Sequence, residues 1–387
     1  RLVAKGACHG LAFGWERPNW FAPEGMEPKY EYSYGRQNWF EPSAVEHRAV
    51  REAVGLLDQC SFAKFRLQGR DAASVLGQVA ANEIDVPVGR VVYTQWLNEQ
   101  GGIEADLTVT RLAADDYLIV TSGEFQVRDF HWLKRHIPDG AHAVLTDVTS
   151  GLSMLGVMGP RARDLVQSLS PDDLSNDSFP FGTSREIELG FAHVRASRIS
   201  YVGELGWELY IPSEFTTGVY DVLVEAGAEF GLRQVGMHAM NSLRIEKAYR
   251  HYGHDITDAD TPLEGGLGFA VKLDKPGGFI GRDALKRQKE AGLKKRLVQF
   301  LLTDSEAMLY HNEPIWRDGV LAGYIRSAMY GHTLGGALGL GYVESPDGVD
   351  ADYVKSGSYE IEIAGVRYPA SASLRPLYDP KSERIKA

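Results

Sequence analysis

The sequence predicts an α+β fold of two or three domains that ends in a small β-domain. Its 387 residues correspond to that number at about 150 residues per domain. Helices and antiparallel strand pairs mix through the first three quarters, without the βαβ alternation of a wound parallel sheet. After Leu297 the pattern is β throughout, with hairpin signals at Arg317-Asp318-Gly319 and Ala364-Gly365.

The composition excludes several classes of protein. The chain is 44% hydrophobic and 24% charged, as globular proteins are, and its net charge of −11 argues against nucleic acid or an anionic membrane as a main partner. No apolar run is long enough to span a bilayer. The two cysteines exclude a disulfide scaffold and favour a reducing compartment, which we expect to be a bacterial cytoplasm or a mitochondrial matrix.

The N-terminal third begins with an aromatic arm of about forty residues, which predicts neither a regular helix nor an alternating strand. Ser43-Ala44-Val45-Glu46 matches a capping box, and apolar spacing then predicts a helix to about Leu57. A short helix is expected over 71–79. The following elements are a β-meander over 91–97, 103–111 and 117–121, a helix over 124–136, and strands over 144–148 and 153–157.

Helices and strands also alternate in the rest of the chain. Gly159-Pro160 opens a helix, and residues 187–212 are β-rich with an interruption at 203–206. Helices are predicted from Ser213 to about Gly227, from His238 to about Arg250, and from Gly281 to Gly292.

Known cofactor motifs are absent from the chain. No Gly-x-Gly-x-x-Gly follows an early strand, so we expect no FAD or NAD site here, and the glycines over 335–341 are expected to serve turns and tight strands. His251-x-x-His254-Asp255 has the spacing of metal ligands but is also common at a hydrogen-bonded helix end. We expect the helix end and predict no metal site.

Two carboxylates are candidates for chemistry. Asp106 lies two residues after Glu104 in a predicted strand, so both side chains face one side, toward solvent or toward a ligand. Glu204 lies between Gly203 and Gly206, which permit close approach of the backbone. It is either an exposed turn residue or a carboxylate that could accept two parallel N–H bonds from an amino-heterocycle.

Six motifs occur in one order over about 190 residues. They are Tyr93, Asn98-x-x-Gly101-Gly102-x-x-x-Asp106-Leu107, Met158-Gly159-Pro160, Tyr201-x-Gly203-Glu204-x-Gly206, Ser242-Leu243-Arg244-x-Glu246 and Phe279-Ile280-Gly281-Arg282-Asp283-Ala284-Leu285. Together they resemble the tetrahydrofolate-dependent glycine-cleavage T-protein (aminomethyltransferase) family.

The chain is still more similar to the C-terminal folate half of sarcosine dehydrogenase, and next to dimethylglycine dehydrogenase, over nearly its whole length. The segments that carry this similarity are 14–18, 199–209, 245–251 and 352–357. Residue 1 is Arg rather than Met, which suggests that a flavin half lies upstream.

The resemblance implies a three-domain cloverleaf ring with folate in its centre and a C-terminal β-barrel-like domain. Residues 1–60 with 150–255 would form a discontinuous folate-binding domain, 61–149 with 256–290 the second domain, and 291–387 the β-domain. Glu204 would bind the pterin edge, Tyr93 and Tyr201 would line the pocket, and Asp106 would act near the reactive folate nitrogens. Arg244 and Arg375 are weaker candidates, the latter for the glutamate tail.

The implied function is capture of the one-carbon unit of an oxidised N-methyl amine, sarcosine or dimethylglycine, as 5,10-methylenetetrahydrofolate. FAD would belong to an upstream domain or a partner flavoprotein. Met240-Asn241 and Thr121 differ from the residues usual in glycine-cleavage proteins and argue against that particular role. Direct folate-dependent demethylation of a sulfonium or ether, or a non-catalytic regulatory or scaffold role, remain as alternatives.

Overall fold

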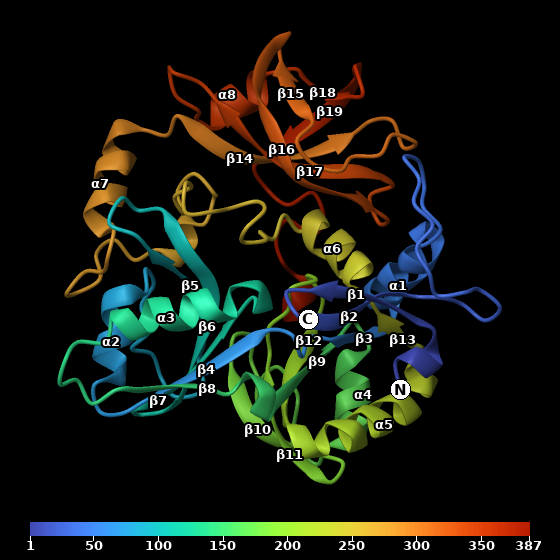
Figure 1. Cartoon of the computed structure of the whole chain (residues 1–387), viewed down its shortest axis with the longest axis vertical. Coiled ribbons are helices and arrows are strands. Elements are labelled where there is room, and N and C mark those ends of the chain that lie inside the picture. The colour runs from blue at the N-terminus through green and yellow to red at the C-terminus, as the bar shows by residue number, and fades with distance from the viewer.

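A computed structural model describes all residues, 1–387, as three lobes around a common centre (Figure 1). Each lobe contains one large sheet, and the domain division proposed from the sequence places one sheet in each domain. Helix α6 (Met237–Glu246) lies near the centre, where the first lobe meets the barrel. None of the helices is long and apolar enough to cross a membrane.

The first lobe is built on a six-stranded sheet in the order β10-β11-β12-β9-β3-β13. The strands are β10 (Ser184–Leu189), β11 (Ala192–Ser197), β12 (Gly206–Pro212), β9 (Leu152–Met158), β3 (Val54–Asp58) and β13 (Leu232–Val235). All neighbouring pairs are antiparallel except β3 with β13. Helices α4 (Ala162–Leu169) and α5 (Thr216–Gly227) supply side chains to a core of 21 buried residues on one face of this sheet.

The helix predicted from Ser43 to Leu57 is wrong at both ends. Helix α1 spans Phe40–Glu52, and the residues that follow it form β3. Ser43 is therefore inside the helix, and Glu46 accepts bonds from Phe21 N and Gly236 N instead of closing a capping box. A short apolar run fits a buried strand as well as a helix, and pairing with β9 and β13 decides between them.

The second lobe contains the five-stranded sheet β5-β6-β7-β4-β8 and confirms the predicted meander. Its strands are β4 (Ala63–Gln68), β5 (Val91–Leu97), β6 (Ile103–Ala113), β7 (Asp116–Thr121) and β8 (Val144–Asp147). Helices α2 (Ala72–Val79) and α3 (Gln126–Arg135) pack on one face around Trp96 and Trp132.

The third lobe is a closed six-stranded barrel in the order β14-β17-β16-β15-β18-β19, which confirms the C-terminal β-domain and both predicted hairpins. Its strands are β14 (Lys295–Leu302), β15 (Pro314–Arg317), β16 (Val320–Gly331), β17 (Gly336–Glu344), β18 (Tyr359–Ile363) and β19 (Val366–Ser373). Helix α7 (Arg282–Ala291) precedes the barrel, and α8 (Ala351–Ser356) lies on it.

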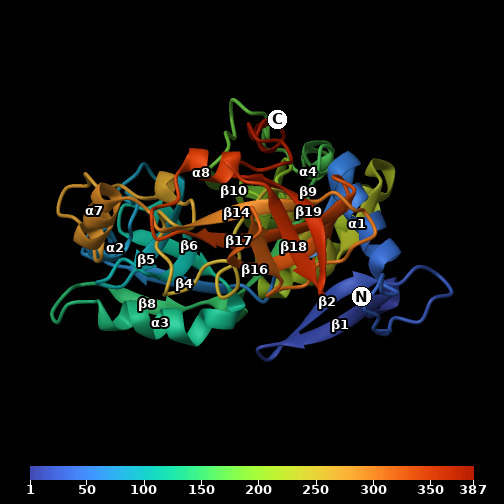
Figure 2. The same cartoon turned by 90° about the horizontal axis from the view of Figure 1, so that it is seen from above.

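Two further expectations are corrected by the structure. The aromatic arm contains an antiparallel hairpin of β1 (Ala7–Ala12) and β2 (Trp15–Phe21), with a register shift between Cys8 and His9, and this hairpin projects along one face of the molecule (Figure 2). Helix α6 ends at Glu246 rather than near Arg250, because Ala248 adopts a positive φ of 52° and turns the chain away.

Candidate active site

Asp106 is presented by the ladder between β5 and β6. It lies directly opposite Gln95, and the alternation of side chains puts Tyr93, Gln95 and Asp106 on one face while Trp96 and Ala105 enter the core of the second lobe. Glu104 has no partner in this ladder, because the register shifts between Trp96 and Leu97, and its common face with Asp106 stays a prediction. Their partners differ, since Glu104 forms an ion pair with Arg128.

The Asp106 carboxylate is partly buried and has no direct cationic partner. Gln95 Nε2 donates to its Oδ1 at 2.8 Å. Burial raises the pKa of Asp106 to about 6, and the Gln95 amide, the Tyr93 hydroxyl and the Arg250 guanidinium oppose that rise. At neutral pH this carboxylate is ionised but only weakly stabilised, as a general base requires.

The first lobe contributes aromatic residues to the same region. The Tyr201 hydroxyl donates to Arg250 O at 2.8 Å, and the Tyr201 ring stacks with Tyr249 at 6.1 Å between centroids. Tyr93 stacks in the same way with Phe269. Tyr93, Asp106, Tyr201, Tyr249 and Arg250 all remain partly exposed although they lie between the lobes, so solvent reaches them. Arg250, which the sequence reasoning missed, is the cation of this cluster.

Glu204 is placed differently from the expectation of an open pterin-binding carboxylate. It is buried, and residues from the last turn of the chain cover it: Arg384 Nε lies 2.9 and 2.8 Å from its two oxygens, and the Tyr378 hydroxyl donates at 2.6 Å. Arg51 Nη1 donates to the same carboxylate at 3.0 Å. A ligand could bind Glu204 only by displacing these donors.

The contact between Arg384 and Glu204 predicts a measurable local effect. Replacing Arg384 by Ala is expected to speed amide hydrogen exchange over residues 376–387, because this contact fastens the C-terminal segment to the first lobe. Global stability should fall by only about 1 kcal/mol or less, since the Arg384 side chain is half exposed. Mass spectrometry of peptides from this segment measures the change. Lys381→Ala, which removes a fully solvated pair, is the control and should leave exchange unaltered.

Glu208 is a second buried carboxylate, and the sequence reasoning passed over it. It lies on β12 on the opposite face from Trp207 and Leu209, which enter the core of the first lobe. Its one protein partner is the Tyr210 hydroxyl at 2.8 Å, and burial raises its pKa to about 7. The sequence feature that could have pointed to Glu208 is an acidic residue inside a strand that is otherwise apolar on both faces.

The surroundings of Glu208 leave acceptors unused. Gly156 lies opposite Glu208 in the ladder, and a Cβ there would fall 2.5 Å from Oε1 of Gln59. That oxygen is buried without a hydrogen-bond partner, as is Oε1 of Gln95 beside Asp106. Unpaired buried acceptors are costly, so their presence favours a ligand that brings N–H donors.

Family comparisons agree with this architecture. Residues 1–275 match the GCVT N-terminal domain, and residues 295–379 match the glycine cleavage T-protein C-terminal barrel domain. The chain belongs to the glycine cleavage T-protein family. Its fold matches the glycine cleavage system aminomethyltransferase T from Bartonella henselae with a TM-score of 0.82 at 22% identity, over 98% of this chain and 96% of that one.

Two relatives of this T-protein-family chain are much longer than it is. The 4-methylaminobutanoate oxidase (formaldehyde-forming) of Paenarthrobacter nicotinovorans is 43% identical over 386 residues, which cover 100% of this chain and 46% of the oxidase. Human mitochondrial sarcosine dehydrogenase is 36% identical over 425 aligned positions, again 100% and 46%. The chain thus spans about half the length of these relatives.

The motif Ser242-Leu243-Arg244 has a structural role, because its arginine links helix α6 to the barrel. Arg244 is buried in an ion pair with Asp255 and donates to Ser327 Oγ at 3.1 Å, which ties α6 to the barrel. Arg375 lies exposed just beyond β19. Thr121 donates to Asp129 at 2.7 Å. We therefore do not carry Arg244 or Arg375 into the proposed site.

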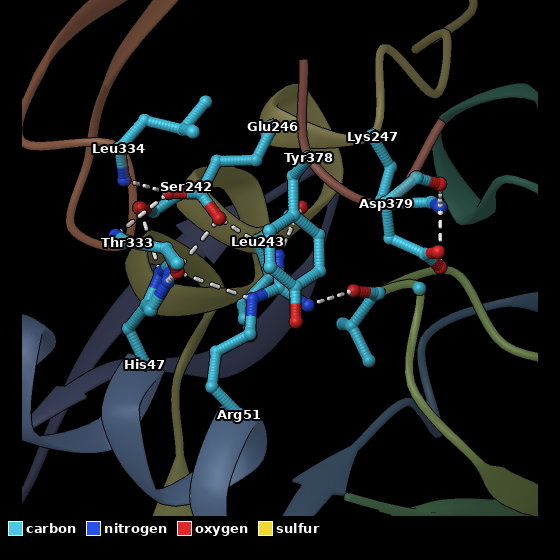
Figure 3. Close-up of polar contacts among 12 residues, drawn as sticks. His47, Arg51, Ser242, Leu243, Glu246, Lys247, Thr333, Leu334, Tyr378 and Asp379 are labelled. Carbon is cyan, nitrogen blue, oxygen red and sulfur yellow. Dashed lines mark hydrogen bonds and ion pairs between the residues drawn. The ribbon is translucent and has the colours of Figure 1, made fainter. Parts of the chain in front are cut away.

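Glu246, the last residue of the same motif, is the centre of a buried polar network (Figure 3). Its carboxylate accepts from Arg51 Nη2 at 2.9 Å and from the backbone N–H groups of Thr333 and Leu334 at 2.8 and 3.2 Å. His47 lies 3.4 Å away and bonds the Thr333 hydroxyl at 2.7 Å. The network joins α1, α6 and the turn between β16 and β17, so it holds the barrel against the first lobe.

Proposed function

We propose that this chain is the tetrahydrofolate-dependent one-carbon transferase part of an enzyme that oxidises an N-methyl amine such as sarcosine or dimethylglycine. Membership of the T-protein family supports the folate-dependent transfer, and the names of the longer relatives, an oxidase and a dehydrogenase, support the coupling to amine oxidation. A flavoprotein domain or subunit would then carry the FAD. The observation on which the proposal rests most is the weakly stabilised carboxylate of Asp106 between the lobes.

The residues present fit a reduced pterin. Its amino-pyrimidine edge carries N–H donors, and the side chains of Glu208 on β12 and of Gln59 just after β3 offer a buried carboxylate and an unpaired carbonyl oxygen on either side of Gly156 in β9. Tyr93 and Tyr201 are partly exposed aromatic residues that a ligand can reach. We therefore propose Glu208 as the carboxylate that recognises the pterin, in place of Glu204, whose oxygens are already bonded.

Bound tetrahydrofolate supplies the nucleophilic nitrogens that take up the one-carbon unit. Asp106 would orient the attacking nitrogen, accept its proton and stabilise positive charge, while Gln95 holds the carboxylate in position. The low-dielectric surroundings that raise the pKa of Asp106 also strengthen these interactions. The lobes that flank the site would limit the escape of the one-carbon unit as formaldehyde.

If Glu208 rather than Glu204 binds the pterin, a matched pair of variants should give opposite results. Glu208→Gln should weaken tetrahydrofolate binding by about tenfold or more, because a charged acceptor is lost and an amide N–H is turned toward the pterin donors. Glu204→Gln should bind tetrahydrofolate as wild type does. Calorimetry with the full chain measures both affinities. The reverse order would restore Glu204 as the pterin ligand, and the absence of binding to wild type would refute the proposed function.

Product analysis separates this function from direct demethylation. When the chain is supplied with an N-methyl amine and a flavoprotein oxidase, we expect 5,10-methylenetetrahydrofolate. Formation of 5-methyltetrahydrofolate from a sulfonium or ether donor would support the alternative demethylase function instead.

A further inference from the structure

Three potential metal ligands converge beside the segment that follows Arg250. A carboxylate oxygen of Glu124 and one ring nitrogen each of His251 and His254 all lie within 4.8 Å of one another. Glu124 Oε2 is 3.9 Å from His251 Nε2, and the two imidazole rings are 4.5 Å apart between centroids. Glu124 comes from the short turn Gly123–Phe125 after β7, more than a hundred residues from the histidines.

The histidine pair is held by a rigid turn. His251 O accepts from the backbone N–H groups of His254 and Asp255 at 3.2 and 2.9 Å, and Asp255 Oδ2 accepts from His251 N at 2.9 Å. Asp255 is itself buried and paired with Arg244. The two imidazoles are therefore positioned on one side of a turn that the buried ion pair keeps closed.

The turn that contains Glu124 packs against the turn that contains His251 and His254. The Phe125 ring meets the Tyr252 ring edge to face at 4.8 Å. Gly253, with a φ of 89°, allows the approach, since a Cβ at that position would lie 2.9 Å from Phe125 Cζ. The Tyr252 hydroxyl donates to Ile103 O at 3.0 Å, which anchors the same turn to β6. The three ligand groups are thus brought together by tertiary contacts that do not depend on an ion.

We propose that Glu124, His251 and His254 bind one divalent transition-metal ion, of which Zn²⁺ is the simplest example. Two imidazoles and one carboxylate suit such an ion and not Ca²⁺ or Mg²⁺, which take oxygen ligands. Tetrahedral coordination at about 2.0–2.2 Å separates ligand atoms by roughly 3.3–3.5 Å. Closure by up to about 1.5 Å, within the reach of side-chain rotation, brings the three groups from within 4.8 Å of one another to that geometry.

The proposed ion would fasten the second lobe to the segment after α6, and three protein ligands leave further coordination positions open. Because His254 is exposed, an ion can enter directly from solvent. This role is independent of folate binding and of the proposed function, since it needs only the folded chain.

The test is metal titration of the full chain after treatment with a chelator. Calorimetry with Zn²⁺ should show one site per chain, and Co²⁺ should give the visible absorption of a four- or five-coordinate nitrogen and oxygen site. Glu124→Gln and His254→Ala should each weaken Zn²⁺ binding by about tenfold or more. His311→Ala, which removes another exposed histidine, should bind as wild type does.

A second measurement guards against misfolded variants and surface binding. Saturating Zn²⁺ should raise the melting temperature of wild type by several degrees and that of His254→Ala by much less, while the metal-free proteins melt alike. The proposal is overturned if wild type shows no saturable single site, or if Glu124→Gln and His254→Ala bind Zn²⁺ as tightly as wild type.

Discussion

Replacing Asp106 by Asn should slow one-carbon transfer by roughly 100-fold to 10,000-fold, the usual contribution of a positioned acid–base group. The amide keeps the size and the hydrogen-bonding reach of the side chain but can neither accept a proton nor balance positive charge. Tetrahydrofolate should bind within a few-fold of wild type, because the proposed pterin acceptors, Glu208 and Gln59, are untouched. Single-turnover transfer and equilibrium binding, measured on the same preparation, separate the two effects.

The pH dependence gives this prediction a second readout. Asp106 works as a base in its ionised form, and burial raises its pKa to about 6. The wild-type rate should therefore be constant well above pH 6 and fall by about tenfold per pH unit below it. The Asp106→Asn variant should lose this dependence.

Glu104→Gln is the matched control for Asp106→Asn, since Glu104 lies two residues away on β6 but is paired with Arg128. It should transfer at the wild-type rate. An Asp106→Asn variant that is equally fast would remove the proposed catalytic role.

Replacing Glu246 by Gln should lower the free energy of unfolding by about 2–3 kcal/mol, the largest stability effect we expect. The change removes one of the two carboxylates that the buried Arg51 guanidinium meets, the one at 2.9 Å, and leaves Glu204 at 3.0 Å as its remaining charged partner. It also puts an amide that must donate as well as accept against the N–H groups of Thr333 and Leu334. Urea denaturation monitored by tryptophan fluorescence measures the loss. Glu306→Gln, which breaks a solvated pair with Arg36, should change stability by less than about 1 kcal/mol.

Acid sensitivity should change in the same variant. Burial disfavours the ionised form of Glu246, but hydrogen bonds and charge from His47 and Arg51 outweigh it and lower its pKa to about 2, from 4.5. A lowered pKa means that the stabilisation is complete above the unfolded value and is lost as the pH falls from about 4.5 toward 2. Wild type should therefore lose more stability across this interval than Glu246→Gln does. Equal losses would show that the network does not depend on the ionised carboxylate.

Sequence periodicity was sufficient to predict those helices, strands and turns whose conformation depends on residues close together in the chain. Alternation over 91–97 and 103–111 predicted β5 and β6. The turn residues Asp318-Gly319 and Ala364-Gly365 predicted two hairpins of the barrel, because a tight turn demands particular backbone angles. The same reasoning was wrong over 54–57, where a run of apolar residues fits two periods equally.

The local pattern of residues thus predicted the α+β class and the C-terminal β-domain, and the ordered motifs made Asp106 a candidate. The hydrogen-bond partners and the burial of each carboxylate, in contrast, depended on tertiary packing. Glu204 and Glu208 are four residues apart and equally acidic, yet Arg384, 180 positions away, covers the first and only Tyr210 bonds the second. Glu124 meets His251 and His254 for the same reason. Burial and the distances between remote segments decide whether a carboxylate has hydrogen-bond partners. Sequence periodicity does not report either of these quantities.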